Sequence, residues 1–286
     1  MEIKTLREAL DWAKEKKVAL GHFNISEISA FRAITRAAKE LEVPVIIGTS
    51  EGEADYVDID IAAEMVKDMR DELNHPIFLN ADHFKSFERC KEAIDAGYDS
   101  VIIDASKLSY DDNLAVTKKV VEYAKSINKD ISVEGEIGYL KGSSEVQKKI
   151  EISSADYTKP EEVADFVKKT GVGRMAVVFG NIHGIVTDQE EKLDIEHFKK
   201  IVAVAPEVYY VLHGASGLKD ADVQAAIKAG ISNVHFNTEL RVAYTEGLHK
   251  ALHDKPGETT PYKYMKPGVE EMKKIVTAKI KIFIGR

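Results

Sequence analysis

The 286-residue sequence contains a single cysteine, Cys90, and no long apolar stretch. One cysteine cannot form an intramolecular disulfide, so we expect a reducing compartment, the cytoplasm. The first residues, MEIKTLREALDWAKEKK, are charged and lack the apolar run typical of a signal peptide. No window approaches the roughly 18 apolar residues of a membrane-spanning helix, so no membrane association is expected.

An excess of positive charge is also missing. The chain has 40 Lys and Arg against 48 Asp and Glu, a formal net charge of −8. Nucleic acids require a basic surface, so they are not expected as partners. A small phosphorylated molecule remains compatible, because a few backbone dipoles in a pocket can hold a phosphate. No Ser/Gly-rich linker divides the chain, which predicts one domain over residues 1–286.

Short apolar runs alternate with amphipathic segments along the chain. Continuous hydrophobicity in the runs indicates strands buried on both faces, as in a parallel sheet. Eight strand–helix alternations favour an α/β fold, a (β/α)₈ TIM barrel, over a doubly wound open sheet. The predicted strands are Val18–Phe23, Val43–Gly48, Pro76–Asn80, Ser100–Asp104, Ile131–Glu136, Met175–Gly180, Val208–His213 and Ser232–Phe236. The predicted helices between them are Ile28–Leu41, Ile61–Leu73, Phe87–Ala96, Leu114–Ile127, Pro160–Lys169, Ile195–Val204 and Ala221–Ala229.

The two ends of the chain add to this pattern. A helix over Leu6–Lys17 is predicted to cap the floor of the barrel. The segment His253–Pro267 contains three prolines and few apolar residues, which predicts a surface loop. A C-terminal helix is predicted over Val269–Lys279.

Histidines gather where the predicted strands end, the rim at which such barrels carry their chemistry. Three imidazoles with one open position are typical of a catalytic metal site, which makes His83, His183 and His213 candidate ligands. Each alone could instead be a hydrogen-bonded structural residue. The histidines at this rim are His22, His83, His183, His213 and His235.

Carboxylates stand at the same rim. Asp82 precedes a candidate ligand, so it could transfer protons or orient the histidine. Glu134 and Glu136 share one strand face. Together with Asp104 they could bind a second cation, or they could form a buried salt-bridge layer.

Glycine-containing loops after the sixth and seventh predicted strands suggest a phosphate site. Gly184 and the stretch Gly214–Gly217 would let backbone N–H groups approach an anion. Asn237 and Thr238, after the eighth strand, would complete the cradle at the usual place in a barrel. Short glycine loops also occur for steric reasons alone.

The assembled motifs resemble the class II, metal-dependent fructose-bisphosphate aldolase family, which includes tagatose-bisphosphate aldolases. The resemblance extends over nearly the whole chain, and the order and spacing of its DH, NIHG and LHGASG motifs are highly specific. The matching stretches are GHFNIS, ADHFKSFERCKEAIDAGYDSVIIDAS, DDNLAVTKKVVEYA, SVEGEIG, FVKKTGVGRMAVVFGNIHG, VLHGASG and NTELRVAY.

The resemblance implies a zinc-dependent aldolase, with another divalent metal as the alternative. Its substrate would be a ketose 1,6-bisphosphate, above all fructose 1,6-bisphosphate. The products would be dihydroxyacetone phosphate and glyceraldehyde 3-phosphate, formed through a metal-stabilised enediolate. A homodimer or homotetramer is implied, with Val269–Ile280 as a contact.

The resemblance also assigns roles to residues. His83, His183 and His213 would bind the metal, and Asp104 and Glu136 match an alternative metal position that leaves room for a second cation. Asp82 would protonate the aldehyde oxygen. The phosphate of dihydroxyacetone phosphate would be held by Gly184, Gly214, Ser216, Asn237 and Thr238, with Asn24 and Ser50 nearby.

The sequence departs from the family pattern at three places. His235 stands where the family has Asn, and Asn80-Ala81 replaces His-Leu before Asp82. Ser144 stands where a mobile loop carries the Glu that removes the C–H proton, with Glu145 one residue later. Glu145 and His235 are therefore the two candidates for this base. The alternatives are another sugar phosphate, an epimerase, or a sugar-phosphate-binding barrel without catalysis. No predicted strand ends in the lysine that a Schiff-base aldolase needs.

Overall fold

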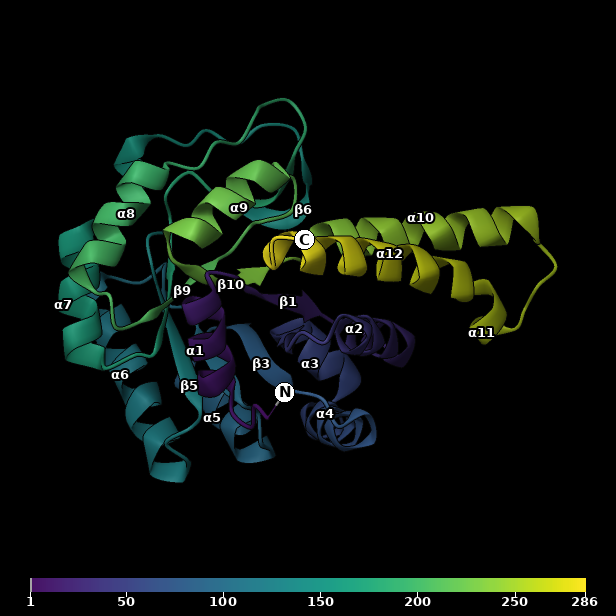
Figure 1. The fold of residues 1–286 in the computed structure, drawn as a ribbon, viewed down its shortest axis with the longest axis horizontal. Helices are drawn as coiled ribbons and strands as arrows, with labels where there is room; N and C mark the ends of the chain where they lie inside the picture. Colours follow the sequence, from purple (N-terminus) through teal and green to yellow (C-terminus); the bar gives the residue numbers. More distant parts are fainter. Residues whose placement is uncertain (1) are drawn as a thin grey trace.

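The computed structural model describes residues 2–286, whose centre is a closed barrel of parallel strands (Figure 1). The barrel strands are β1 (Leu20–Asn24), β2 (Val45–Ser50), β3 (Ile77–Phe84), β4 (Ser100–Ile103), β5 (Ser132–Ile137), β7 (Arg174–Val177), β9 (Tyr209–Leu212) and β10 (Ile231–His235). Their order around the barrel is β1-β10-β9-β7-β5-β4-β3-β2, so the first and last strands pair. The predicted (β/α)₈ TIM barrel is confirmed, and each predicted run contributes one strand.

Amphipathic helices cover the outside of the barrel. In α2, Ala30, Ile34, Ala37 and Ala38 are buried at helical spacing against the strands. The helices α2, α5 and α8 have the predicted bounds. The covering helices are α2 (Ile28–Leu41), α4 (Ile59–Leu73), α5 (Phe87–Ala96), α6 (Tyr110–Ile127), α7 (Pro160–Thr170), α8 (Ile195–Val204) and α9 (Asp220–Ala229).

The N-terminal helix α1 (Leu6–Lys16) closes the amino-terminal end of the barrel, as predicted. Leu6 and Leu10 pack in one cluster with Leu20, Ile46 and Phe78, which lie near the beginnings of β1, β2 and β3. The opposite end of the barrel, where the strands finish, is therefore the end left open for a site.

The structure contains elements that the sequence pattern did not predict. They are α3 (Glu51–Val57), the strand pair β6 (Gly142–Gln147) and β8 (His183–Val186) outside the barrel, a short 3₁₀ turn at Ser154–Asp156, α10 (Thr238–Asp254) and α11 (Pro261–Tyr264). The predicted loop His253–Pro267 is wrong in part, because it contains α11 and the start of α12 (Lys266–Phe283). Pro261 and Pro267 lie in the first turns of these helices, where a missing N–H costs no hydrogen bond.

Helices α10 and α12 form a hairpin that projects from the barrel (Figure 1). Glycines allow the two helices to cross closely, because a Cβ at Gly247 would lie 2.7 Å from the Gly268 Cα atom. The hairpin is anchored by Met272, Val276 and Phe283, which are buried in the main core. Within residues 2–286, no helix has both the length and the apolar character needed to cross a bilayer.

Candidate active site

A cavity of about 460 Å³ opens at the carboxyl ends of the barrel strands. Its walls bring together side chains that the sequence placed on different strands and loops. Among its lining residues are eight of the predicted site residues: Asn24, Ser50, Asp82, His83, Asp104, Glu136, His183 and Asn237. Two further predicted residues, His213 and His235, are 2% and 8% exposed and do not line the cavity.

Asp82 and His83 face the same cavity because the backbone at His83 is left-handed, with φ +52°. In a regular strand, neighbouring side chains point to opposite faces. Here the register between β3 and β4 shifts between Ala81 and Phe84, which is where the alternation breaks. A non-glycine residue in this conformation costs about 1–3 kcal/mol and is typical of functional sites.

His83 and His213 form the centre of the candidate metal site. The His83 Nε2 and His213 Nδ1 atoms are 2.9 Å apart, and the rings are nearly perpendicular at 87°. The outer nitrogens lie against carboxylates: His83 Nδ1 is 3.0 Å from Asp104 Oδ2, and His213 Nε2 is 2.7 Å from Glu134 Oε1. If each outer N–H donates to its carboxylate, both inner lone pairs face one another. That arrangement requires a cation between them.

The electrostatics of this spot favour positive charge. Burial lowers the pKa of His83, but Asp82, Asp104 and Glu136 together raise it to about 10. Glu136 completes a tight ligand group with His83 and His213, and its buried Oε2 atom has no hydrogen-bond partner among the described residues. Imidazole nitrogens and carboxylate oxygens are the donor set of a divalent transition metal. The residues present therefore fit a metal.

His183 stands beside this group. Its ring centroid is 5.4 Å from that of His83, and its side chain lines the cavity. Burial, together with the neighbouring His83 and His213, lowers its pKa to about 4, so it is the neutral imidazole that a metal ligand must be. The three predicted ligands thus meet at one rim, but the side chain closest to His83 and His213 is Glu136.

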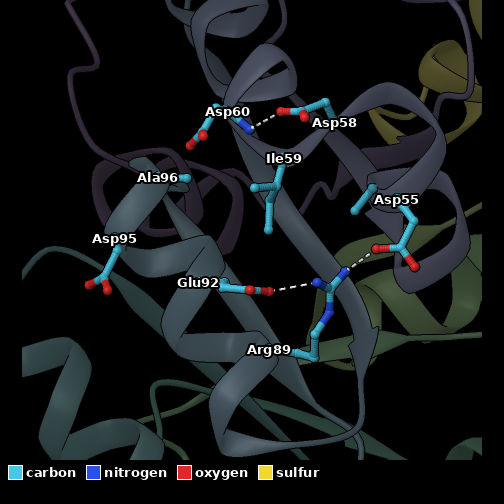
Figure 2. A pocket seen from close by; sticks show the side chains of 9 residues that line it. Asp55, Asp58, Ile59, Asp60, Arg89, Glu92, Asp95 and Ala96 are labelled. Carbon is cyan, nitrogen blue, oxygen red and sulfur yellow. Dashed lines mark hydrogen bonds and ion pairs between the residues drawn. The ribbon is translucent and has the colours of Figure 1, made fainter.

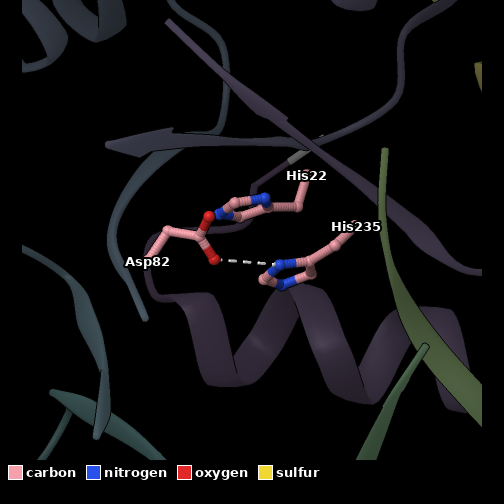
Figure 3. A group of neighbouring side chains, drawn as sticks. All are labelled: His22, Asp82 and His235. Carbon is pink, nitrogen blue, oxygen red and sulfur yellow. Dashed lines mark ion pairs between the residues drawn. The ribbon is translucent and has the colours of Figure 1, made fainter. Parts of the chain in front are cut away.

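Two neighbouring groups have metal-binding residue types but unsuitable geometry. In the group His22, Asp82 and His235, the two rings are stacked at 3.6 Å with planes 6° apart (Figure 3). In the group Glu134, His213 and His235, the two rings are stacked at 4.2 Å with planes 15° apart. Imidazole lone pairs lie in the ring plane, so stacked rings cannot direct them to one ion. Only the group around His83 and His213 has converging nitrogens.

Asp82 lies beside the stacked pair with its carboxylate fully engaged. Its Oδ1 atom is 3.3 Å from His235 Nδ1 (Figure 3), and its Oδ2 atom accepts a 2.9 Å hydrogen bond from Asn24 Nδ2. Burial raises the pKa of Asp82, but His83, His235 and His22 hold it well below its usual range. Asp82 therefore rests as a carboxylate, ready to accept a proton first and donate it afterwards.

A buried polar layer lies beneath the histidines. Arg174 is fully buried, 3.3 Å from Glu134 Oε2, and donates a 2.7 Å hydrogen bond to Asn80 Oδ1. Asn80 in turn contacts His22 Nε2 at 3.1 Å. The structural interpretation of Glu134 as part of a salt-bridge layer is thus correct, whereas Glu136 faces the cavity. Arg174 was missed because it stands at the edge of an otherwise apolar run.

Comparisons with known proteins identify this constellation. A family model described as class II fructose-bisphosphate aldolase matches residues 4–285. The chain belongs to the class II fructose-bisphosphate aldolase family. It is 37% identical to the fructose-bisphosphate aldolase of Staphylococcus aureus (strain Mu50), covering 99% of this chain and 98% of that relative. It is 35% identical to the enzyme of that name from Geobacillus stearothermophilus, over 99% and 97% of the two chains.

A solved structure supports the same assignment. The crystal structure of the YdjI aldolase from Escherichia coli K12 superposes with a TM-score of 0.83 at 29% identity, covering 97% of this chain and 96% of that one. This chain is thus an aldolase, a carbon–carbon lyase of a metal-dependent family.

The predicted phosphate side of this class II aldolase is only partly exposed to the cavity. Asn237 lines it, whereas Gly184, Gly214, Ser216 and Thr238 do not. The missing side chains of the two glycines make room for protein backbone. A Cβ at Gly184 would lie 2.2 Å from Ser143 O, and one at Gly214 would lie 2.0 Å from Ile182 O. Ser216 Oγ accepts from Glu239 N at 3.4 Å, and Thr238 Oγ1 is 3.1 Å from Ser144 Oγ.

The segment predicted as a flexible loop is strand β6 of this aldolase, paired with β8. Ser143 and Ser144 line the cavity, but Glu145 is exposed and faces a neighbouring hollow beside α10. Arg241 of α10 holds the strand by donating to the backbone oxygen and the hydroxyl of Ser144. Glu145 is thus close in sequence to the cavity wall but outside it.

Another hollow lies among α3, α4 and α5 on the outside of the aldolase barrel (Figure 2). Its acidic residues are used structurally. Asp58 caps α4 by accepting from the backbone of Asp60 and Ile61, and Arg89 pairs with Asp55 and Glu92. This hollow therefore stabilises the helix layer and has no part in the site.

Proposed function

We propose that this aldolase cleaves a ketose carrying a 1-phosphate, releasing its first three carbons as dihydroxyacetone phosphate and the rest as an aldehyde. Fructose 1,6-bisphosphate and tagatose 1,6-bisphosphate are ketoses of this kind. The observation that carries the proposal is the left-handed backbone at His83, which brings a carboxylate and a metal ligand side by side into one cavity.

We propose zinc as the metal, held by His83, His183 and His213, with another divalent metal as the alternative. Asp104 and Glu136, on the other side of His83, offer an alternative position or room for a second cation. When bound, the metal supplies a Lewis acid to the ketone and hydroxyl oxygens of the substrate. Glu134 and Asp104 keep the two central imidazoles oriented.

Asp82 is proposed to move the proton on the oxygen that becomes the aldehyde. In cleavage it removes the hydroxyl proton at the bond that breaks, because it rests ionised beside the metal group. In the reverse direction it returns this proton. Asn24 and His235 hold its two oxygens in place.

Glu145 is proposed to exchange the proton on carbon after a local shift of β6. Its neighbours Ser143 and Ser144 already border the cavity, so one residue of displacement would turn its carboxylate inward. The rival is His235, whose Nε2 atom is buried without a hydrogen-bond partner among the described residues but whose ring is packed between His22 and His213.

The phosphate is proposed to lie against Asn237, Thr238 and Ser216, with the backbone N–H groups of Gly184 and Gly214. Support comes from the N-terminus of α10, which begins at Thr238 beside the cavity and favours an anion.

Cleavage of fructose 1-phosphate and fructose 1,6-bisphosphate, coupled to detection of dihydroxyacetone phosphate, tests the proposal. The zinc-loaded enzyme should cleave at least one of the two, and a chelator should abolish the reaction until zinc is restored. Epimerisation without cleavage would indicate the alternative enzyme. Binding without turnover would indicate a sugar-phosphate-binding barrel.

We further propose one functional domain over residues 1–286, a cytoplasmic location and a homodimer or homotetramer. The single buried, unpaired Cys90 suits a reducing compartment. The projecting α10–α12 hairpin, which contains Val269–Ile280, offers a surface for a second copy (Figure 1).

A further inference from the structure

Glu53 places a carboxylate in the wall of the cavity next to Asp82. It belongs to the first turn of α3 and lines the cavity with Asn24 and Ser50. Asn24 connects the two carboxylates, because its Nδ2 atom donates to Glu53 Oε2 at 2.7 Å and to Asp82 Oδ2 at 2.9 Å. Glu53 is thus one amide group away from the residue that handles the aldehyde oxygen.

Glu53 also occupies the donors that an incoming phosphate would need on this side. Its Oε2 atom accepts from Asn24 Nδ2, from Ser50 N at 2.8 Å and from Ser50 Oγ at 2.9 Å. Both N–H bonds of the Asn24 amide and the hydroxyl proton of Ser50 are therefore directed at carboxylates. Neither residue has a side-chain proton left for an anion.

The remaining cations of the cavity stand at its mouth. The Lys85 side chain is 71% exposed and lies 3.9 Å from Glu51, and the exposed Lys107 lies over the Tyr139 ring. An aldehyde whose oxygen is at Asp82 has its next carbons beside Glu53, before it can reach either lysine. Like charges brought together in a pocket discriminate strongly against a ligand.

We infer that Glu53 makes this aldolase select an uncharged, hydroxyl-bearing aldehyde half over a phosphorylated one, so that ketose 1-phosphates are preferred to ketose 1,6-bisphosphates. The inference deepens the proposed function and rests on it. The free hydroxyls of such an aldehyde can donate to Glu53 and accept from solvent, whereas a phosphate adds a second negative charge beside an occupied carboxylate.

The alternative role of Glu53 is purely structural, since it also forms a capping box with Ser50 at the start of α3. Glu8 provides a matched control. It holds the same capping-box position in α1, accepting from Thr5 N, at the closed end of the barrel. Glu53→Gln keeps an acceptor oxygen and removes the charge, and Glu8→Gln makes the same change far from the cavity.

The test compares kcat/KM for cleavage of fructose 1-phosphate and fructose 1,6-bisphosphate by the zinc-loaded enzyme at pH 8. We expect the wild type to favour the monophosphate at least about tenfold. Glu53→Gln should reduce this preference at least about tenfold, mainly by lowering KM for the bisphosphate, and Glu8→Gln should leave it unchanged.

Equal or better cleavage of the bisphosphate by the wild type would overturn the inference, even if Glu53→Gln fails to fold. An unchanged preference in a folded Glu53→Gln variant would overturn it too. In both cases cleavage itself leaves the proposed function standing. Cleavage of neither ketose by the wild type would instead refute the proposed function, and the inference with it.

Discussion

The ring nitrogens His83 Nε2 and His213 Nδ1 face each other at 2.9 Å, although the two residues are 130 positions apart in the chain. Each ring has a carboxylate at its far nitrogen, so the pair is held from outside and open inside. This relationship defines the metal site more sharply than the count of histidines at the rim.

Replacing His213 with Ala should therefore remove the metal and the activity while the barrel stays folded. We expect zinc retained after dialysis to fall below about a tenth of the wild-type content, with an unchanged far-ultraviolet circular dichroism spectrum, because two remaining imidazoles bind weakly. His249→Ala, at an exposed position of α10, is the control. A fully loaded, active His213→Ala enzyme would refute the ligand assignment.

The buried pair of Arg174 and Glu134 leads to a stability prediction. Arg174→Met should lower the free energy of unfolding by about 3 kcal/mol, since it leaves a buried carboxylate without its cation. The double variant Arg174→Met/Glu134→Gln should recover much of this loss. Urea unfolding measures both. Equal stability of the single and double variants would show that the pair is not coupled.

The two candidates for the carbon base can be separated by isotope exchange. Glu145→Ala should lower kcat by orders of magnitude with little change in KM, and should slow exchange of the C–H proton of dihydroxyacetone phosphate with deuterium. His235→Asn is the parallel variant. Normal exchange in Glu145→Ala with loss in His235→Asn would place the base inside the barrel, despite the stacking of His235.

Borohydride should not trap a substrate adduct on this enzyme. Among residues 2–286, the barrel strands contain no lysine, and Lys85 at the cavity mouth is mostly exposed and retains an ordinary amine environment beside Glu51. A Schiff base requires a buried or otherwise activated amine. Mass spectrometry after borohydride treatment with dihydroxyacetone phosphate should show the unmodified chain, and any reduced lysine adduct would argue against metal-based chemistry.

Glu191 predicts a pH dependence of stability away from the site. Burial raises the pKa of its carboxyl to about 8, and neither oxygen has a hydrogen-bond partner among the described residues. The folded state thus prefers the protonated acid. Its stability relative to the unfolded chain, whose glutamate ionises near 4.5, falls as the pH rises from 4.5 through 8.

Glu191→Gln should therefore melt at the same temperature as the wild type at pH 5 but about 3 °C higher at pH 9. The exposed neighbour Glu190, which pairs with Lys219, is the control, and Glu190→Gln should show no such gain. Parallel melting curves of wild type and Glu191→Gln at both pH values would contradict the assignment of a buried acid.

The sequence pattern was sufficient for the barrel because each strand there is a continuous apolar run between amphipathic helices. It was also sufficient for His83, Asp82 and His183, which follow directly from strand ends. It failed where tertiary contacts decide. Strand β6 is polar and exists through pairing with β8, and α10 has no clear apolar face because it packs mainly against α12.

The residues missed in the site are those whose role depends on a partner distant in the chain. Arg174 is indistinguishable in sequence from a strand-edge cation until Glu134 and Asn80 are placed beside it. Glu53 reads only as a helix-capping residue, since its contact with Asn24 joins two separate strand ends. Spacing along the chain contains no information on either contact.

The left-handed backbone at His83 has a consequence for transplanting this chemistry into other scaffolds. An Asp-His pair grafted onto a regular strand would send one side chain into the barrel and the other outward, into the helix layer. The strand bulge would have to be copied along with the two side chains. The portable unit is therefore a backbone shape that the letters D and H do not record, and a barrel that lacks it can match the motif without sharing the activity.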